Sequence, residues 1–305
     1  MTHDWTSDAW HPALHGLVVR RGGEIIHERY GEGEDFHLDQ ALGNVTFGPE
    51  TLHDIRSVTK SVVGLLYGKA LGDGQVAAPE EPLMAQFPEY PELPGRAELT
   101  VEHALTMTMG LLWDESAPYT STANSEIAME FAPDRFRFIL EQPQVEPPGR
   151  TWTYSSGASA LVARLIEKGT GLRLDDYARK VLFEPLGIDR FEWSAGADGV
   201  VRAASGLRLT PRDLAKIGQY VLDQGITMEP HFKIADEFWY AHQWYLGPTP
   251  QPWMGGFGNG GQRLYVVPSL DLVVAVTAGL YNLPIEEQGA PSGKVVEAIL
   301  AAMAR

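Results

Sequence analysis

The stretch His53-Asp-Ile-Arg-Ser57-Val-Thr-Lys60-Ser61 decides which fold the whole chain is predicted to adopt. If residues 57 to about 71 form a helix, Ser57 and Lys60 lie one turn apart on one face, so their side chains can touch. The unpaired backbone N–H groups and the dipole at the helix start favour the alkoxide character that a serine nucleophile develops. The spacing therefore predicts a serine nucleophile with a lysine as its base.

The same spacing also has a purely structural interpretation, in which Ser57 caps the helix and Lys60 is a solvated lysine. With 13 serine and 7 lysine residues in 305 positions, random placement gives roughly 0.3 such matches per chain, so the motif alone is a weak signal. The catalytic interpretation therefore depends on partner motifs further along the chain.

The composition is that of an ordinary globular protein. Hydrophobic residues make up 44% and charged residues 21% of the 305 positions, values typical of a chain with a substantial core, and we expect one domain spanning 1–305. The net charge of −16 argues against nucleic acid or an anionic membrane as a partner, because both would repel the protein. The expected partner is a small-molecule substrate, and the oligomeric state is left open.

Several kinds of chemistry are disfavoured by what the sequence lacks. Cysteine is absent, so disulfides, thiolate metal sites and cysteine nucleophiles are excluded. The nine histidines include no pair at metal-ligand spacing and no His-Glu-x-x-His, so we expect no metal and no cofactor. Residues 1–8 show no secretory signal and no apolar run reaches roughly 18 residues, so we expect a cytoplasmic protein without a membrane span.

Strand signals concentrate near the two ends of the chain, and helix signals in its middle. A Gly-Gly turn at 22–23 joins two short apolar runs into an expected hairpin. Further strands are expected at 238–246, 263–267 and 272–278, and helices at 101–107, 125–141, 155 to about 169, 175–182 and 294–303. This order predicts an α/β lobe built from residues 1–56 and 200–305, with a helical lobe inserted at 57–199.

Two further motifs follow the Ser-x-x-Lys stretch in a suggestive order. Tyr154-Ser-Ser156 lies at a loop-to-helix junction, and Asn259-Gly-Gly-Gln262 lies where a glycine-rich loop enters a strand. Ser-x-x-Lys, then Tyr-x-x, then a glycine-containing triplet on a C-terminal strand resembles the layout of the serine β-lactamase and penicillin-binding-protein superfamily.

The resemblance extends beyond the three motifs. The segments 53–61, 104–114, 148–156 and 258–268 are similar to the class C-like branch of that superfamily, which includes esterases and 6-aminohexanoate-dimer hydrolases. The resemblance implies an α+β fold, in which an antiparallel sheet is flanked by helices and carries an inserted helical lobe.

The resemblance also implies a role for each matched residue. Ser57 would be the acyl-forming nucleophile and Lys60 its base, which requires the lysine pKa to fall by about three units from its usual value. Tyr154 would share proton transfer, first to the leaving group and then from the deacylating water. The backbone N–H groups of Ser57 and Gln262 would form the oxyanion hole.

Departures from the family pattern bear on the substrate. Ser156 stands where many members have asparagine, and Asn259, followed by Gly260 and Gly261, stands where β-lactamases have lysine. These four residues are predicted to contact the substrate. Trp113 and Tyr245 adjoin the matched segments and are further candidates for the substrate cleft, although such aromatic residues are more often core.

We therefore expect a serine hydrolase that forms an acyl-enzyme on a small ester or amide. A D-amino-acid peptidase or a β-lactamase is an alternative, disfavoured because Asn259 lacks the positive charge that would pair with a β-lactam carboxylate. A catalytically idle binding module of the same fold is an alternative from another class, which burst kinetics with an activated ester would detect.

Overall fold

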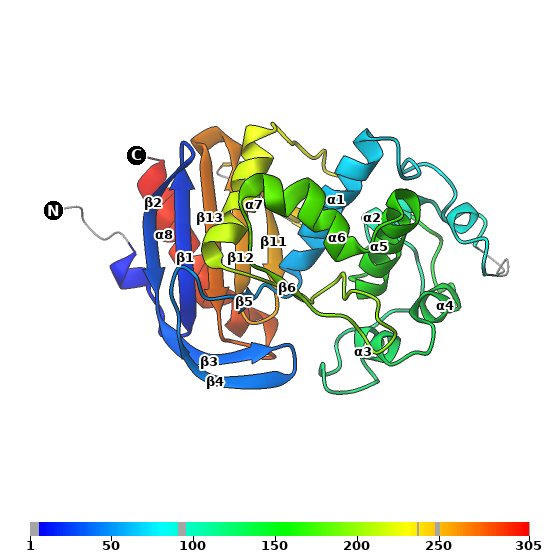
Figure 1. The fold of residues 1–305 in the computed structure, drawn as a ribbon, viewed down its shortest axis with the longest axis horizontal. Coiled ribbons are helices and arrows are strands. Elements are labelled where there is room, and N and C mark those ends of the chain that lie inside the picture. Colours follow the sequence, from blue (N-terminus) through cyan, green and yellow to red (C-terminus); the bar gives the residue numbers. More distant parts are fainter. Residues whose placement is uncertain (1–5, 91–95, 237, 248–250, 305) are drawn as a thin grey trace.

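The computed structural model describes residues 6–90, 96–236, 238–247 and 251–304. The expectation of no secretory signal rests largely on residues 1–5, which lie outside this range. Figure 1 shows a large sheet on one side of the molecule, helices α2 (Val101–Leu105), α3 (Ser125–Glu130), α4 (Arg135–Leu140) and α5 (Ser156–Thr170) on the other, and α1 (Val58–Gly72) between them. The predicted mixture of helices and an antiparallel sheet is confirmed.

The large sheet has eight antiparallel strands in the order β2-β1-β13-β12-β11-β10-β9-β8. The strands are β1 (Leu14–Arg21), β2 (Glu24–Tyr30), β8 (Phe232–Ala235), β9 (Phe238–Ala241), β10 (Trp244–Gly247), β11 (Trp253–Gly258), β12 (Gln262–Val267) and β13 (Leu272–Ala278). The two ends of the chain meet where β1 pairs with β13, so the sheet forms only after distant segments come together. The division of the chain into two lobes stays a prediction.

Strand β13 shows how the sheet is held between helices. All seven of its residues are buried. Val273 and Ala275 pack into the core that the sheet shares with α1, α5 and α7 (Pro211–Asp223). Leu272, Val274 and Val276 point to the opposite face, against the C-terminal helix α8 (Ile285–Met303). A strand buried on both faces reads as a continuous apolar run, which is why its bounds could be predicted from the sequence.

Smaller elements complete the fold. A two-stranded sheet pairs β3 (Glu32–His37) with β4 (Gln40–Thr46), and a three-stranded sheet has the order β5 (His53–Asp54), β7 (Leu207–Leu209), β6 (Glu192–Trp193). The remaining helical elements are α6 (Leu174–Ala178), the π-helix η3 (Arg179–Phe183), and the 3₁₀ turns η1 (Ser7–Ala9), η2 (Leu83–Gln86), η4 (Glu184–Leu186) and η5 (Pro268–Leu270). Among the described residues, no helix is long and apolar enough to cross a membrane.

Three predicted elements differ from those observed, each because of a local or tertiary contact. The strand expected at 238–246 is the hairpin β9–β10, whose turn residues His242 and Gln243 have φ of 42° and 73°. The helix expected at 125–141 is divided into α3 and α4 around the Pro133 segment. Helix α8 begins nine residues before position 294, because Gln288 and Ser292 bond to the β11–β12 turn and fix its first half.

Gly64 and Gly68 both lie inside α1, and the sequence predicts close backbone packing at each. The structure supports this at Gly64 only, where a Cβ atom would overlap the carbonyl oxygen of His242. Nothing lies within 4 Å of a Cβ built at Gly68.

Gly64→Ala is therefore expected to destabilise the protein by about 2 kcal/mol or more, because the helix must move away from the β9–β10 turn. Gly68→Ala is the matched control and is expected to stabilise it by about 0.5–1 kcal/mol through helix propensity. Urea unfolding of both variants measures the difference. Equal effects at the two positions would contradict the packing described for α1.

Candidate active site

Ser57 and Lys60 meet at the start of α1. Ser57 is the N-cap residue of the helix, and Lys60 Nζ donates hydrogen bonds to Ser57 Oγ at 3.1 Å and to the carbonyl oxygen of Ala204 at 3.0 Å. The lysine side chain is almost fully buried, with 2% of its surface exposed. Lys60 is therefore held against the serine and is not a solvated surface lysine.

The residue before Ser57 has an unusual backbone conformation. Arg56 has φ of 49°, a left-handed conformation that costs a non-glycine residue about 1–2 kcal/mol. Its guanidinium donates to the carbonyl oxygen of Leu38 at 2.6 Å, pairs with Asp54 at 3.2 Å, and lies 4.6 Å above the ring of Tyr281. These contacts stabilise the strained turn that places Ser57 at the N-terminus of α1.

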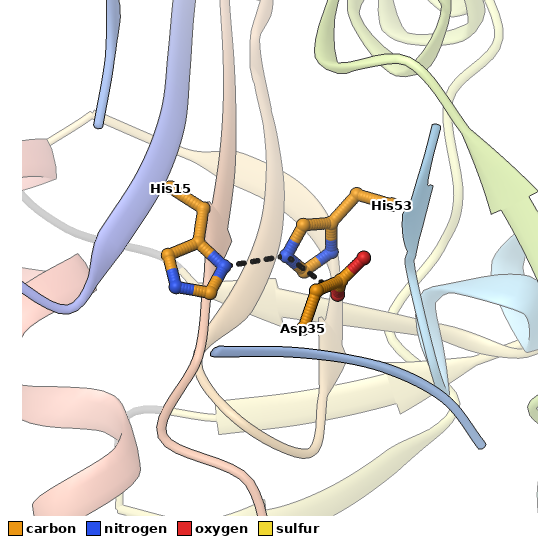
Figure 2. Close-up of side chains that lie close together, drawn as sticks. All are labelled: His15, Asp35 and His53. Carbon is orange, nitrogen blue, oxygen red and sulfur yellow. Dashed lines mark hydrogen bonds and ion pairs between the residues drawn. The ribbon is translucent and has the colours of Figure 1, made fainter. Parts of the chain in front are cut away.

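A buried polar cluster supports the strand that leads into this turn. Figure 2 shows His15 and Asp35 converging on His53, which belongs to β5, four residues before Ser57. His15 Nδ1 and His53 Nε2 are 2.9 Å apart, and His53 Nδ1 lies 2.9 Å from the carbonyl oxygen of Asp54. Since Nδ1–H of His53 donates to that carbonyl, its Nε2 accepts from His15, and both rings are neutral. Burial lowers the pKa of His15 to about 4 and that of His53 to about 3.

Acid is therefore expected to destabilise the fold through these two histidines. Their pKa values lie below the unfolded-state value of 6.5, so the unfolded chain takes up protons first as the pH falls from 6.5 towards 4. Between pH 7.5 and pH 5.0 we expect a loss of about 2 kcal/mol for each histidine, measured by urea unfolding. His15→Phe should reduce this difference. Replacing the exposed His11 by glutamine should leave it unchanged, and an unchanged difference in His15→Phe would refute the assignment.

Tyr154 completes a compact group with the serine and lysine. Its ring centroid lies 4.7 Å from Lys60 Nζ. Burial first, and then the neighbouring Tyr245, Tyr119 and Glu115, raise the pKa of Tyr154 well above 10, and a hydrogen bond from Ser57 opposes this rise. The phenol therefore stays protonated at neutral pH, which suits a proton donor to a leaving group.

Burial and charge act in opposite directions on the pKa of Lys60. Burial lowers the pKa of Lys60, and the carboxylates of Glu126 and Glu115 raise it. Burial and the nearby Glu126 in turn raise the pKa of Glu115 to about 7. Protonation of Glu115 near neutral pH would remove one of the charges that hold the lysine in its ammonium form.

Glu115 forms hydrogen bonds with both Trp113 and Ser156, two of the residues predicted to bind substrate. Its carboxylate accepts hydrogen bonds from Trp113 Nε1 at 2.6 Å, from the backbone N–H of Ser156 at 2.7 Å and from Ser156 Oγ at 3.1 Å. Trp113 is 7% exposed and packs against Gly157, where a Cβ atom would lie 2.7 Å from the indole. Glu115 therefore joins Ser156 to Trp113, and both of these residues are buried; their contact with substrate stays a prediction.

Sequence reasoning did not identify Glu115 or Glu126 as site residues. Glu115 comes directly after the segment 104–114 that carried the family resemblance, and Glu126 lies in α3, where Ser205 Oγ donates to it at 2.7 Å. A single glutamate in a loop or short helix gives no sequence signal, because most such residues are solvated. Only the fold brings both carboxylates to the lysine.

Tyr245 lies at the edge of the same group. Its ring stacks on that of Phe257 with centroids 4.8 Å apart, and it meets Tyr240 edge-on at 5.1 Å. It is also near enough to Tyr154 to raise the pKa of that phenol. The position is compatible with the predicted contact between Tyr245 and substrate.

The glycine-rich motif lies at the predicted place, where a turn enters strand β12, and its contact with substrate stays a prediction. Residues 259–261 form the turn between β11 and β12, and they pack on α8: Gly260 N–H donates to Gln288 at 2.7 Å. Gln262 is fully buried, and its side chain bonds to the backbone of Ala278 at 2.6 and 3.0 Å. Within the described part of the chain, no hydrogen bond or ring contact joins Asn259, Gly260, Gly261 or Gln262 to Ser57, Lys60 or Tyr154.

Strand β11 is the part of the sheet that packs closely against the start of α1. A Cβ atom on Gly256 would lie 2.8 Å from Ser61 Oγ and 2.9 Å from Val58, and one on Gly258 would lie 2.6 Å from the carbonyl oxygen of Ile55. The glycines allow the backbone of β11 to lie directly against the start of α1. The sequence analysis does not identify Gly256 and Gly258 as residues that contact the start of α1.

Glu115→Gln is expected to move the acid limb of the kcat/KM profile to lower pH by about one unit. The amide keeps acceptors for Trp113 and Ser156 but removes a negative charge that raises the Lys60 pKa, so the lysine stays neutral at lower pH. Hydrolysis of an activated ester between pH 5 and 9 measures the shift. The exposed Glu141→Gln is the control, and an acid limb that does not move in Glu115→Gln would refute the coupling.

Two groups of side chains in the described residues have metal-ligand geometry, although the sequence spacing indicated none. One is His15, Asp35 and His53, and the other is Glu102, His231 and His242. In the first group the ring nitrogens that face each other are hydrogen-bonded, Asp35 pairs with Arg208 at 3.1 Å, and at most 1% of each residue is exposed. Because Arg208 already neutralises Asp35 and the group is closed to solvent, it is a hydrogen-bond network and not a metal site.

Comparison with known proteins agrees with the fold. The beta-lactamase family model matches residues 14–292. The 6-aminohexanoate-dimer hydrolase of Paenarthrobacter ureafaciens is 23% identical over 85% of this chain and 70% of its own length. A penicillin-binding protein from Bacillus halodurans superposes with a TM-score of 0.73 at 17% identity, covering 98% of this chain and 99% of its own. EstCE1, a hydrolase with promiscuous acyltransferase activity, superposes with a TM-score of 0.76 at 14% identity, covering 96% and 95%.

At such low identity the two superpositions establish the fold alone. The family model spans nearly the whole chain, including the Ser57–Lys60 pair, Tyr154 and strand β11. The chain therefore belongs to the beta-lactamase family, with hydrolases among its relatives.

Proposed function

We propose that this protein is a serine hydrolase that forms an acyl-enzyme on Ser57 from a small ester or amide. The observation that carries the proposal is the buried hydrogen bond between Lys60 Nζ and Ser57 Oγ, beside the Tyr154 phenol. A nucleophile in contact with a desolvated amine is arranged for proton removal without a histidine.

The proposed first step transfers the acyl group to the serine. Neutral Lys60 takes the Ser57 proton as Oγ attacks the carbonyl carbon, and the carbonyl electron pair moves onto its oxygen. When the tetrahedral intermediate collapses, the bond to the leaving group breaks and Tyr154 supplies its proton. Lys60 then returns the proton to the phenol. A water attacks the acyl-enzyme in the second step with the same groups acting in reverse.

We propose that the developing oxyanion is bound by two backbone N–H groups. The first is that of Ser57, at the start of α1, where N–H groups are unpaired. The second is that of Gln262, which pairs with Gly258 across the β11–β12 hairpin; a Cβ atom on Gly258 would lie 2.6 Å from the carbonyl oxygen of Ile55, two residues before Ser57. A donor pair of this kind is often worth about 10²-fold or more in rate.

The charges around Lys60 favour neutral esters and amides over β-lactams. Glu115 and Glu126 both act on the lysine, and a substrate carboxylate placed beside them would be repelled. Asn259 adds no positive charge, and its side chain bonds to Asn282 at 3.2 Å. A linear amide fits the relative named for the 6-aminohexanoate dimer, and an ester fits equally.

A fluorophosphonate probe followed by mass spectrometry tests the proposal. One label per folded chain, on the peptide that contains Ser57 and absent from Ser57→Ala, is the expected result. A label on another serine, or none on folded protein, would refute the assignment of Ser57 as the nucleophile.

Burst kinetics with an activated ester separates a hydrolase from an idle binding module, since the hydrolase shows a steady state after the burst. A panel of acyl esters, linear amides, a D-amino-acid peptide and a chromogenic cephalosporin ranks the substrates.

A further inference from the structure

Three side chains from distant segments meet on the side of the molecule where α2 faces the β9–β10 turn. Glu102 lies on α2, His231 directly precedes β8, and His242 lies in the turn between β9 and β10. Glu102 Oε1 is 2.7 Å from His231 Nδ1, and Oε2 forms a hydrogen bond with His242 Nε2 at 3.0 Å. Their donor atoms all lie within 4.8 Å of one another, close enough to share one ion.

One of the carboxylate oxygens has no satisfactory partner within the described residues. Glu102 Oε1 is buried and makes no hydrogen bond of acceptable geometry, although His231 Nδ1 is only 2.7 Å away. The two imidazole rings lie 4.9 Å apart at 33°. A buried carboxylate oxygen next to a ring nitrogen, with no well-aligned hydrogen between them, could be satisfied by a bound cation.

The histidine in the turn is held in place by its neighbours. His242 has φ of 42°, and the next residue, Gln243, donates from its side chain to the carbonyl oxygens of Ala104 at 3.1 Å and Leu105 at 2.9 Å. The same turn rests on Gly64 of α1. Glu102 is therefore fixed relative to His242, because its helix is bonded to the turn. Such preorganisation favours metal binding.

The group is also open to solvent, unlike the buried histidines of Figure 2. The side chains of His231, His242 and Glu102 are 40%, 31% and 24% exposed, so an ion can enter and water can complete its coordination. Two imidazoles, one carboxylate and water form the donor set of many four-coordinate zinc sites. Magnesium and calcium prefer oxygen-only ligands.

We propose that Glu102, His231 and His242 bind one divalent transition-metal ion of the zinc type. The bound ion links α2 to the segments that flank the β8–β9–β10 edge of the sheet, so it acts as a cross-link between the helices and the sheet edge. The metal site does not include Ser57, Lys60 or Tyr154, so this proposal does not depend on the proposed hydrolase function.

The test uses full-length protein without a histidine tag, stripped with a chelator and titrated with zinc chloride. Calorimetry is expected to show one site, and Co²⁺ is expected to give the visible absorption of a tetrahedral centre. Magnesium chloride should give no heat. His231→Gln and Glu102→Gln should each weaken zinc binding by at least about tenfold, by loss of a ligand. The exposed His11→Gln is the matched control and should bind zinc as the parent does.

Zinc should also raise the melting temperature of the parent and of His11→Gln, but less for the two site variants. His231 is a surface residue, so His231→Gln is expected to keep the far-UV circular dichroism of the parent. No zinc uptake at micromolar concentration, or uptake equal in the parent and both site variants, would show that the three side chains form only hydrogen bonds and ion pairs.

Discussion

Lys60→Ala is expected to lower kcat/KM for an activated ester by about 10³- to 10⁴-fold, the range associated with losing a general base that contacts the nucleophile. The lysine has no substitute, because the nearby carboxylates of Glu115 and Glu126 act on Lys60 and do not contact Ser57 among the described hydrogen bonds. Fluorophosphonate labelling of Ser57 should slow in parallel, since that reaction also needs the proton to leave the hydroxyl.

Two further variants separate catalysis from folding in this experiment. Lys69→Ala removes a lysine from the same helix whose Nζ donates to the Tyr220 hydroxyl at 3.3 Å, and it should leave kcat/KM unchanged. Lys60→Met fills the buried space without an amine, so it should be as inactive as Lys60→Ala while unfolding at an equal or higher temperature. Full activity in either Lys60 variant would place the base elsewhere.

Regular patterns in the sequence predicted the parts of the fold that depend on local apolar periodicity. Strand β13 is apolar throughout and buried on both faces, and the apolar and glycine signals around α5 also mark its bounds. The β9–β10 turn was missed, because its residues His242 and Gln243 adopt positive φ without being glycine. Hydrogen bonds from Gln243 to α2 stabilise that turn, and they cannot be inferred from the sequence of the turn itself.

The candidate site also has one part that the sequence predicts and another that depends on tertiary packing. The Ser57–Lys60 contact follows from helical spacing, so the sequence alone could predict it. Glu115 and the glycines of β11 reach the site only through the packing of α5, α1 and the sheet. Gly260 and Gly261 also contact α8, which the motif alone does not indicate. Spacing identifies residues that share one element, but it does not show which other elements pack against them.

Tyr154→Phe is expected to reduce kcat/KM by about 10²- to 10³-fold for substrates with poor leaving groups, because it removes the proton donor next to Ser57. The loss should be smaller for p-nitrophenyl esters, whose leaving group departs as a stable anion and needs no proton. This dependence on the leaving group distinguishes a proton donor from a residue that merely positions Lys60, since a positioning defect would slow all substrates alike.

The matched control for this prediction is Tyr240→Phe. Tyr240 is also buried, burial raises its pKa well above 10, and its ring meets that of Tyr245, but no contact joins it to Ser57 in the described structure. Its replacement should leave both substrate classes unaffected. A plot of log kcat/KM against leaving-group pKa should become steeper in Tyr154→Phe only, because the departing group must then carry its own charge. An unchanged slope in Tyr154→Phe would transfer the acid role to Lys60, which already holds the Ser57 proton when the leaving group departs.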